Sequence, residues 1–158
     1  EYNKALYRRL FEEAINQGSL ETVDELVSPN YVNYNFPAST PGSDGFKQVI
    51  GMFRTAFPNI RVDVEQVFAE GDTVIGRGAF VGSHQGPFQG IPPTGKQVKV
   101  PYIDIWRIEG GKFVENWVQM DLLGLMQQFF VVPPPPSTLV MSGAVSLEFL
   151  RRYRALVK

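Results

Sequence analysis

The stretch 102-YIDIWRIEGGKFVENWVQMD-121 predicts a β-hairpin. Two runs rich in isoleucine, valine, phenylalanine and tryptophan flank Gly110 and Gly111, which supply the positive φ angles that a two-residue hairpin turn needs. With these glycines as the loop, Ile108 faces Phe113 and Asp104 faces Trp117. The stretch therefore indicates a long antiparallel pair around which the other elements are arranged.

This register predicts two unlike faces, because side chains alternate between the faces of a strand. One face mixes aromatic and carboxyl groups, which suits a ligand cavity: Tyr102, Asp104, Trp106, Glu115, Trp117, Gln119 and Asp121. The opposite face is mostly apolar: Ile103, Ile105, Arg107, Val114, Asn116, Val118 and Met120. A one-residue bulge would exchange the two faces over part of the hairpin.

Apolar residues at helical spacing predict three helices before the sheet. They cover residues 2–17, 20–27 and 46–57. Gly18 suits a left-handed helix end, and Ser19 is a preferred N-cap for the second helix. Residues 31–36 alternate aromatic with polar side chains and indicate a short strand or extended arm, and residues 37–45 indicate a loop.

Alternation of period two then predicts four long antiparallel strands. They cover residues 60–68, 73–83, 96–108 and 113–121. Glycines 76, 78 and 82 indicate bulges or the curvature with which a sheet wraps a cavity. A glycine- and proline-rich excursion follows at residues 84–95, and residues 122–130 indicate a short helical or coil exit. Helices followed by strands predict an α+β fold, with the helices packed on one face of a curved antiparallel sheet.

The end of the chain has a different composition. Four prolines at 133–136 predict a stiff, extended linker, and residues 142–157 predict an amphipathic helix. We therefore divide the chain into a globular domain, residues 1–128, and a tail, residues 129–158. The tail helix would cover the cavity of its own domain or reach a second subunit.

Composition excludes several classes of function. The chain has 158 residues, 44% of them hydrophobic, which suits one domain with a substantial core. A net charge of −1 without a basic stripe argues against nucleic acid, and no apolar run approaches the ~18 residues of a membrane span. Without cysteine and with one histidine, neither a thiolate nor a histidine-rich metal site can form. We expect a cytoplasmic protein, with secretion left open because the chain begins at Glu1 without methionine.

Three ionisable residues are candidates for acid/base chemistry. Asp121 ends a strand beside Trp117, where desolvation would raise its pKa for proton abstraction next to a carbonyl, although it equally suits the N-cap of the following helix. Asp104 is disfavoured in mid-strand, which indicates either a second cavity acid or one half of an ion pair. His84 titrates near neutral pH, or else hydrogen-bonds the backbone of its loop.

Aromatic and amide side chains are the candidates for substrate binding. Tyr102, Trp117, Trp106 and Phe88 would line a pocket for a flat ring system, or else form ordinary core. Asn33 and Asn35 would hydrogen-bond a ligand, or else serve as turn residues. Arg107 and Glu115 fit surface partners better than catalysts.

Two stretches carry a family resemblance: GSHQGPFQGIPPTGK at 82–96 and DIWRIEGGKFVENWVQMD at 104–121. Together with the opening helices and the Tyr31-Val32-Asn33 arm, they resemble the SnoaL-like polyketide cyclase or ester cyclase family over about residues 4–128. The resemblance implies the cone-shaped α+β barrel of nuclear transport factor 2 and ketosteroid isomerase. It also implies intramolecular aldol ring closure without a metal or organic cofactor, with a cavity acid as general acid/base.

The resemblance assigns positions to individual residues. His84 matches the histidine that opens the glycine-rich excursion, Asp104 the polar position before the Trp-Arg pair, and Asp121 the acidic position that closes the last strand. The chain departs from the family in two places. Tyr34 replaces the histidine that follows the arm in many members, and Val118 stands where some members carry an acid directly after the tryptophan.

The leading hypothesis is a cofactor-free cyclase, isomerase or aldol-type lyase that acts on a hydrophobic, polyketide-like carbonyl compound. Asp121 or Asp104 would take the α-proton, and His84 would assist at the oxyanion. The alternatives are a non-catalytic binding or dimerising scaffold with the same fold, and a hydrolase for an epoxide or ester. We also expect a homodimer, because the outer face of so apolar a sheet must be covered.

Overall fold

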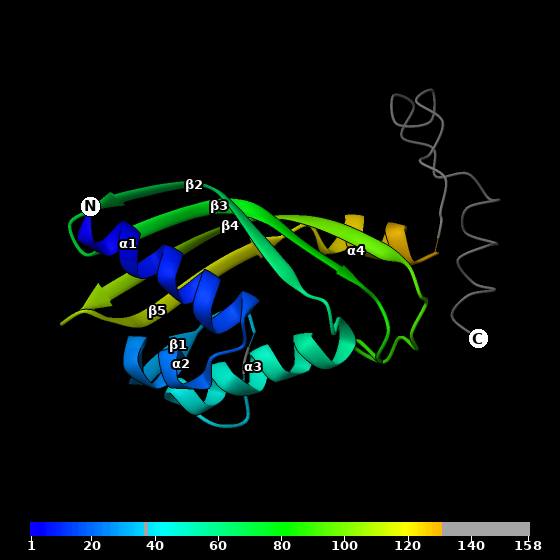
Figure 1. The fold of residues 1–158 in the computed structure, drawn as a ribbon, viewed down its shortest axis with the longest axis horizontal. Helices are drawn as coiled ribbons and strands as arrows, with labels where there is room; N and C mark the ends of the chain where they lie inside the picture. Colours follow the sequence, from blue (N-terminus) through cyan, green and yellow to red (C-terminus); the bar gives the residue numbers. More distant parts are fainter. Residues whose placement is uncertain (37, 131–158) are drawn as a thin grey trace.

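A curved sheet with helices on one side forms the body of the protein in the computed structural model, which describes residues 1–36 and 38–130 (Figure 1). The elements in chain order are α1 (Tyr2–Arg9), the π-helical η1 (Leu10–Asn16), α2 (Leu20–Leu26), β1 (Val27–Asn33), α3 (Gly42–Ala56), β2 (Arg61–Glu70), β3 (Thr73–Ser83), β4 (Gln97–Glu109), β5 (Lys112–Met120) and α4 (Leu122–Phe130). The α+β prediction is confirmed. The predicted tail helix and proline linker lie outside the described residues.

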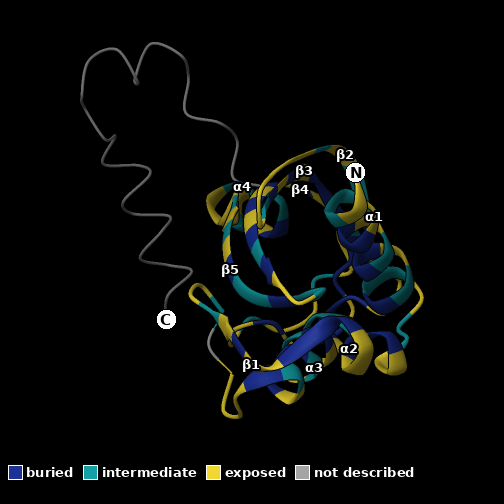
Figure 2. Ribbon diagram, turned by 90° about the vertical axis from the view of Figure 1, so that its left-hand side faces the viewer, coloured by how far each residue is buried: buried dark blue, intermediate teal, exposed yellow. Residues whose placement is uncertain are grey.

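The sheet has the order β1-β5-β4-β3-β2. The four predicted strands, β2 to β5, pair antiparallel as expected. The segment predicted as a short arm adds a fifth strand, β1, which runs parallel to β5, so the sheet is mixed. The sheet remains open, with β1 and β2 at its edges, and curves around the helices without closing into a barrel (Figure 2).

The central hairpin turns where the sequence predicts, with φ angles of 57° at Gly110 and 77° at Gly111. Ile108 pairs with Phe113, but the register then shifts so that Arg107 pairs with Glu115 and Asp104 with Val118. The predicted facing of β5 beyond Phe113 is therefore wrong. One extra residue in β5 rotates every later side chain to the other face.

The bulge decides which side chains of β5 face the helices. Asn116 pairs with Trp106 and is buried, whereas Trp117 pairs with Ile105 on the outer face. The inner face of the hairpin thus carries Tyr102, Asp104, Trp106 and Asn116, all of them buried.

The opening helix, predicted over residues 2–17, is α1 continued by η1. In η1 the N–H of Gln17 donates to the carbonyl of Glu12, five residues earlier, at 3.0 Å. Gly18 then ends the helix with a φ of 78°, and the Oγ of Ser19 accepts from the N–H of Thr22 at 3.2 Å. Both predicted helix signals are confirmed.

The third helix, α3, begins at Gly42, earlier than predicted, because apolar periodicity starts only at Phe46. Core side chains fill the space between the helices and the inner face of the sheet; the largest fully buried ones include Tyr7, Phe57 and Phe113. Within residues 1–36 and 38–130, no helix is both long and apolar enough to cross a membrane.

Candidate active site

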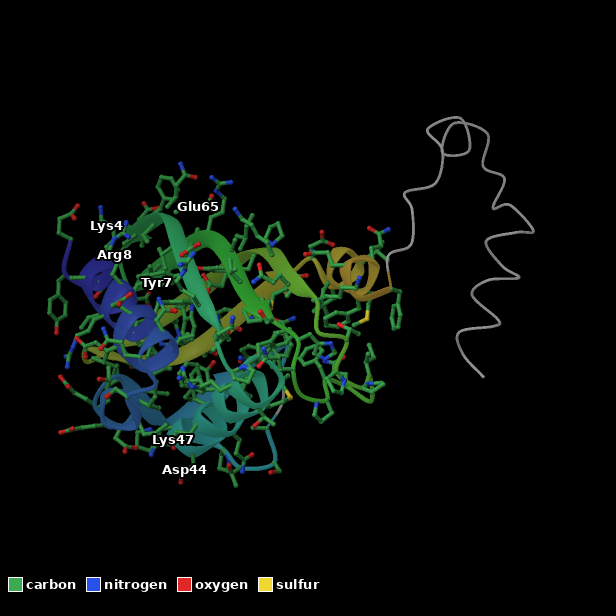
Figure 3. All side chains as sticks on the ribbon, turned by 45° about the vertical axis from the view of Figure 1, so that its right-hand side comes forward. Lys4, Tyr7, Arg8, Asp44, Lys47 and Glu65 are labelled. Carbon is green, nitrogen blue, oxygen red and sulfur yellow. The ribbon has the colours of Figure 1, made fainter. Side chains whose placement is uncertain are left out.

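Asp104 is a buried acid in the middle of β4, with 2% of its surface exposed. Tyr7 lies on α1 (Figure 3). Its hydroxyl donates to Asp104 Oδ1 at 2.8 Å, and the indole Nε1 of Trp106 donates to Asp104 Oδ2 at 2.7 Å. A 3.3 Å hydrogen bond links the hydroxyls of Tyr7 and Tyr102. Within the described residues, Asp104 is therefore held by neutral donors and not by the Lys or Arg that an ion pair would require.

Burial raises the pKa of Asp104 to about 7, and the hydrogen bonds from Trp106 and Tyr7 oppose this shift only in part. A carboxyl group with this pKa is present in both protonation states near neutral pH. It can take a proton from a weak carbon acid and return it, which an ordinary exposed aspartate does poorly.

Gly76 of β3 makes the close approach of Tyr7 to Asp104 possible. It pairs with Asp104 across the sheet, and a Cβ at this position would lie 1.8 Å from the Tyr7 hydroxyl and 2.8 Å from Asp104 Oδ1. Real Cβ atoms do not approach other atoms so closely, so any side chain here would displace Tyr7. The glycines predicted to curve the sheet thus also make room for this hydrogen bond.

An inner pocket of about 110 Å³ opens beside Asp104. Its walls are apolar except for Tyr102, Asp104, Trp106 and Asn116, and among the described residues Asp104 is its only carboxylate or cation. Two predicted binding residues, Tyr102 and Trp106, line it. The remaining lining side chains are Phe11, Ile15, Phe36, Phe46, Val49, Ile50, Phe53, Ile60, Val62, Phe80, Val118 and Met120.

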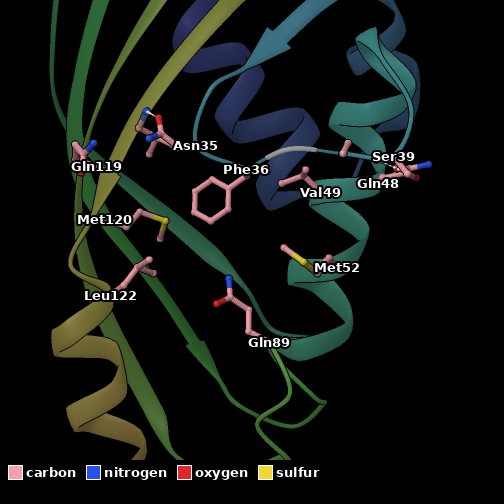
Figure 4. Close-up of a pocket in the computed structure, with 12 residues that line it drawn as sticks. Asn35, Phe36, Ser39, Gln48, Val49, Met52, Gln89, Gln119, Met120 and Leu122 are labelled. Carbon is pink, nitrogen blue, oxygen red and sulfur yellow. Dashed lines mark hydrogen bonds between the residues drawn. The ribbon is translucent and has the colours of Figure 1, made fainter.

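An outer chamber of about 500 Å³ adjoins the inner pocket (Figure 4). Four side chains line both spaces and form the boundary between them: Phe36, Val49, Val118 and Met120. The other walls of the outer chamber come from Asn35, Ala38, Ser39, Gln48, Met52, Gln89, Gln119 and Leu122. Together the two spaces offer a ligand an apolar inner pocket with one carboxyl group and an outer chamber lined by several carboxamides.

Asp121 and His84 do not line either space. Asp121 is exposed, and its Oδ1 accepts from the N–H of Gly124 at 2.8 Å, which caps α4 as the alternative interpretation predicted. His84 is fully buried; its Nδ1 accepts from the N–H of Thr94 at 3.2 Å, and its ring stacks on Phe129 at 4.2 Å. Burial lowers the pKa of His84, and a backbone contact with Gly86 opposes the shift.

The remaining predicted binding residues are divided between the pocket, the core and the outer face. Asn35 lines the outer chamber, and Asn33 donates at 3.2 Å to Oδ1 of Asn116, which lines the inner pocket. Phe88 is 1% exposed in the core and lines neither space. Trp117 lies on the outer face, where its ring stacks on Tyr34 at 4.9 Å.

Tyr34, at the position where the resemblance implies a histidine in many members, therefore turns away from the pocket. Its hydroxyl donates to Glu115 at 2.8 Å, and Glu115 also pairs with Arg107 across the β4–β5 ladder. The interpretation of Arg107 and Glu115 as surface partners is confirmed.

Sequence reasoning missed Tyr7, Asn116, Phe36 and Gln89. One signal was available for Tyr7: a mid-strand Asp needs donors, and glycines 76 and 78 leave space beside it in the neighbouring strand. The position of Asn116 depended on the bulge. Across residues 1–36 and 38–130, no group of three or more His, Cys, Asp or Glu side chains could hold a metal ion.

Comparison with known proteins supports this picture. The model of the SnoaL-like polyketide cyclase family matches residues 5–129. Nogalonic acid methyl ester cyclase from Streptomyces nogalater is 28% identical over 121 residues, which cover 73% of this chain and 88% of that protein.

Solved structures of similar sequence have the same fold. TsrD from Streptomyces laurentii superposes with a TM-score of 0.76 at 31% identity, covering 83% of this chain and 96% of its own. AclR from Streptomyces galilaeus, a proposed hydroxylase, gives 0.72 at 26% identity and covers 96% of this chain and 95% of its own. Because the family model spans most of the sequence, the chain belongs to the SnoaL-like polyketide cyclase family.

Proposed function

We propose that this protein is a cofactor-independent cyclase that closes a ring in a hydrophobic, polyketide-like carbonyl compound, with Asp104 as its general acid/base. The single observation that carries the proposal is a carboxyl group with a pKa of about 7 on the wall of an apolar pocket. The relationship to a nogalonic acid methyl ester cyclase supports the reaction class.

The proposed reaction is an intramolecular aldol addition. The Asp104 carboxylate removes a proton from a carbon next to a carbonyl group, and the C–H electron pair becomes an enolate. The enolate carbon attacks a second carbonyl carbon of the same molecule, which forms a C–C bond and leaves an alkoxide. The alkoxide takes the proton back from Asp104, so the carboxylate is regenerated and no proton is gained or lost.

The chain's own residues set up these steps. Tyr7 and Trp106 each hold one oxygen of Asp104, so the carboxyl group is oriented before the substrate arrives. The apolar walls exclude water, which would otherwise protonate the enolate before the ring closes. His84, expected to assist at the oxyanion, lines neither space, and Asp104 therefore supplies the returning proton in this proposal.

The inward position of Asp104 also favours an enzyme over a scaffold. A purely structural domain gains nothing from an acid buried beside a pocket, since such a group costs stability when it ionises. An exposed carboxylate and a pocket filled by aromatic rings would have favoured the scaffold.

Two asparagine variants test the proposal, with nogalonic acid methyl ester as the trial substrate. Asp104→Asn should lower turnover on the order of 10²–10⁴-fold, the usual contribution of a general acid/base, with the fold intact by circular dichroism. Asp121→Asn should keep its activity, because asparagine also caps a helix. Retained turnover in Asp104→Asn would overturn the assignment, and loss confined to Asp121→Asn would transfer the role to Asp121.

A further inference from the structure

The outer chamber carries polar groups but no charge. Carboxamides of Asn35, Gln48, Gln89 and Gln119 and the hydroxyl of Ser39 lie around it, and no Asp, Glu, Lys, Arg or His is among its described lining residues. A ligand carboxylate or phosphate in this space would lose water without gaining a cation. The chamber therefore suits an uncharged group that offers hydroxyl or carbonyl oxygens.

Two of these carboxamides are already engaged by their own neighbours. Gln48 Oε1 accepts from the hydroxyl of Ser39 at 2.9 Å, and Asn35 Oδ1 accepts from the N–H of Val118 at 2.7 Å. Gln89 differs from these two, because its side chain makes no hydrogen bond to another described residue and rises from the loop into the chamber (Figure 4).

Gln89 sits in a tight turn that its residue type does not favour. The N–H of Phe88 donates to the carbonyl of Ile91 at 3.0 Å and the reverse bond is 2.9 Å, so Gln89 and Gly90 form a two-residue hairpin loop. Their φ angles are 46° and 81°, which correspond to a type I′ turn. Such turns prefer Asn-Gly, and Gln89 is the only non-glycine residue with positive φ in the described ranges.

The turn is fixed to the body of the protein through its first residue. The ring of Phe88 is 1% exposed and packs 5.5 Å from the rings of both Phe53 and Phe57. The carboxamide of Gln89 is therefore presented from a rigid base. Glutamine is longer than the asparagine that this turn prefers, and its side chain points into a cavity. This combination indicates that the extra length serves to contact a ligand.

We propose that the outer chamber is a subsite for the uncharged, oxygen-bearing end of the substrate, and that Gln89 determines specificity there by hydrogen-bonding a hydroxyl or carbonyl group. This inference rests on the proposed function for the rest of the substrate, whose apolar part would occupy the inner pocket. It adds to that function a residue, Gln89, that would select a neutral oxygen-bearing group over a charged one.

Three probes that cannot cyclise test the subsite by binding alone: a dihydroxyanthraquinone carboxylic acid, its methyl ester, and the methyl ester without the hydroxyl groups. Affinities are measured by fluorescence quenching for the wild-type full chain, Gln89→Asn and Gln85→Asn. The last variant makes the same chemical change in the same excursion but outside the chamber. Turnover plays no part, so failure here is distinct from failure of Asp104 as the acid/base.

The wild type should bind the hydroxylated ester at least 10-fold more tightly than the acid. Gln89→Asn should weaken binding of the hydroxylated ester on the order of 2- to 10-fold, the value of one hydrogen bond, and leave the unhydroxylated ester unchanged. Its thermal midpoint should equal or exceed that of the wild type, because Asn-Gly suits the turn better, while Gln85→Asn should bind as the wild type does.

Several results would overturn the inference. They are equal affinity for acid and ester, equal effects of Gln89→Asn on both esters, no binding of any probe by the wild type, or a lower thermal midpoint in Gln89→Asn. The last would show that glutamine is the residue the turn itself requires.

Discussion

At the scale of single residues, one property of Asp104 serves the proposed chemistry and weakens the fold. The unfolded chain releases the proton of this carboxyl group near its ordinary pKa of 3.8, whereas the folded protein holds it until about pH 7. Folding is therefore favoured at acidic pH by the neutral form, and this contribution is lost as the pH rises through the folded-state pKa. The ionisation that would activate the enzyme is the one that costs stability.

This linkage predicts a pH dependence of the unfolding free energy. Between about pH 4 and pH 7 the contribution of Asp104 should fall by up to about 4 kcal/mol, the equivalent of three pKa units. Urea unfolding of the wild type and of Asp104→Asn across this range measures it, because the variant lacks the titration. Gln85→Asn, which removes no ionisable group, serves as the control and should keep the wild-type slope; parallel curves for all three proteins would contradict the prediction.

At the scale of elements, the site depends on two strands that depart from regularity. The bulge in β5 turns Asn116 inward, and Gly76 in β3 leaves the space that the Tyr7 hydroxyl occupies. The π-helical η1 adds to this arrangement, because its Phe11 and Ile15 line the inner pocket. Each of these irregularities places a side chain at the inner pocket or beside Asp104.

Replacement of Gly76 tests the role of the space it leaves. Gly76→Ala should destabilise the protein by about 1–3 kcal/mol through overpacking and move Tyr7 away from Asp104. Gly51→Ala is the matched control. Gly51 lies within α3 with nothing near the added methyl group, so this change should stabilise by about 0.5–1 kcal/mol.

Denaturant unfolding measures the free energy of unfolding of both variants, which should fall in Gly76→Ala and rise in Gly51→Ala. If Gly76→Ala were as stable as the wild type, Tyr7 would not depend on the absence of a Cβ at this position.

At the scale of the whole molecule, the open sheet leaves an apolar row on its outer face. Ile75 pairs with Ile105, and Ile105 pairs with Trp117, so the three side chains lie next to one another across three strands. Each is 39% exposed, and Ile103 beside them is 52% exposed. Contiguous exposed apolar surface of this kind favours association with a second copy of the chain.

The homodimer expected from the sequence thus remains a prediction with a defined surface. Sedimentation of the full chain should give a dimer, and Ile105→Lys should give a folded monomer, because a charge at the centre of the row cannot be buried unpaired. Leu123→Lys, at an exposed apolar residue of α4 away from the row, should remain dimeric. A monomeric wild type at micromolar concentration would count against this surface.

Much of this architecture followed from local sequence. Alternation of period two defined β2 to β5, helical spacing defined the helices, and Gly110-Gly111 defined the turn, because each signal acts between residues a few positions apart. The sequence also named Asp104 as a candidate, since an acid in mid-strand requires a special environment, but it offered Asp121 as an equal choice. By itself it determined the class of fold and not which acid lies at the pocket.

Tertiary structure decided what surrounds that acid. Tyr7 hydrogen-bonds Asp104 although the two are 97 positions apart in the sequence, and β1 joins the sheet beside β5. The bulge places Asn116, and not Trp117, on the inner face. These outcomes depend on which packing of distant segments satisfies the most buried groups at once. No local period encodes such a choice, so the pocket, its mouth and the displacement of His84 and Asp121 from it emerged only when the chain was folded.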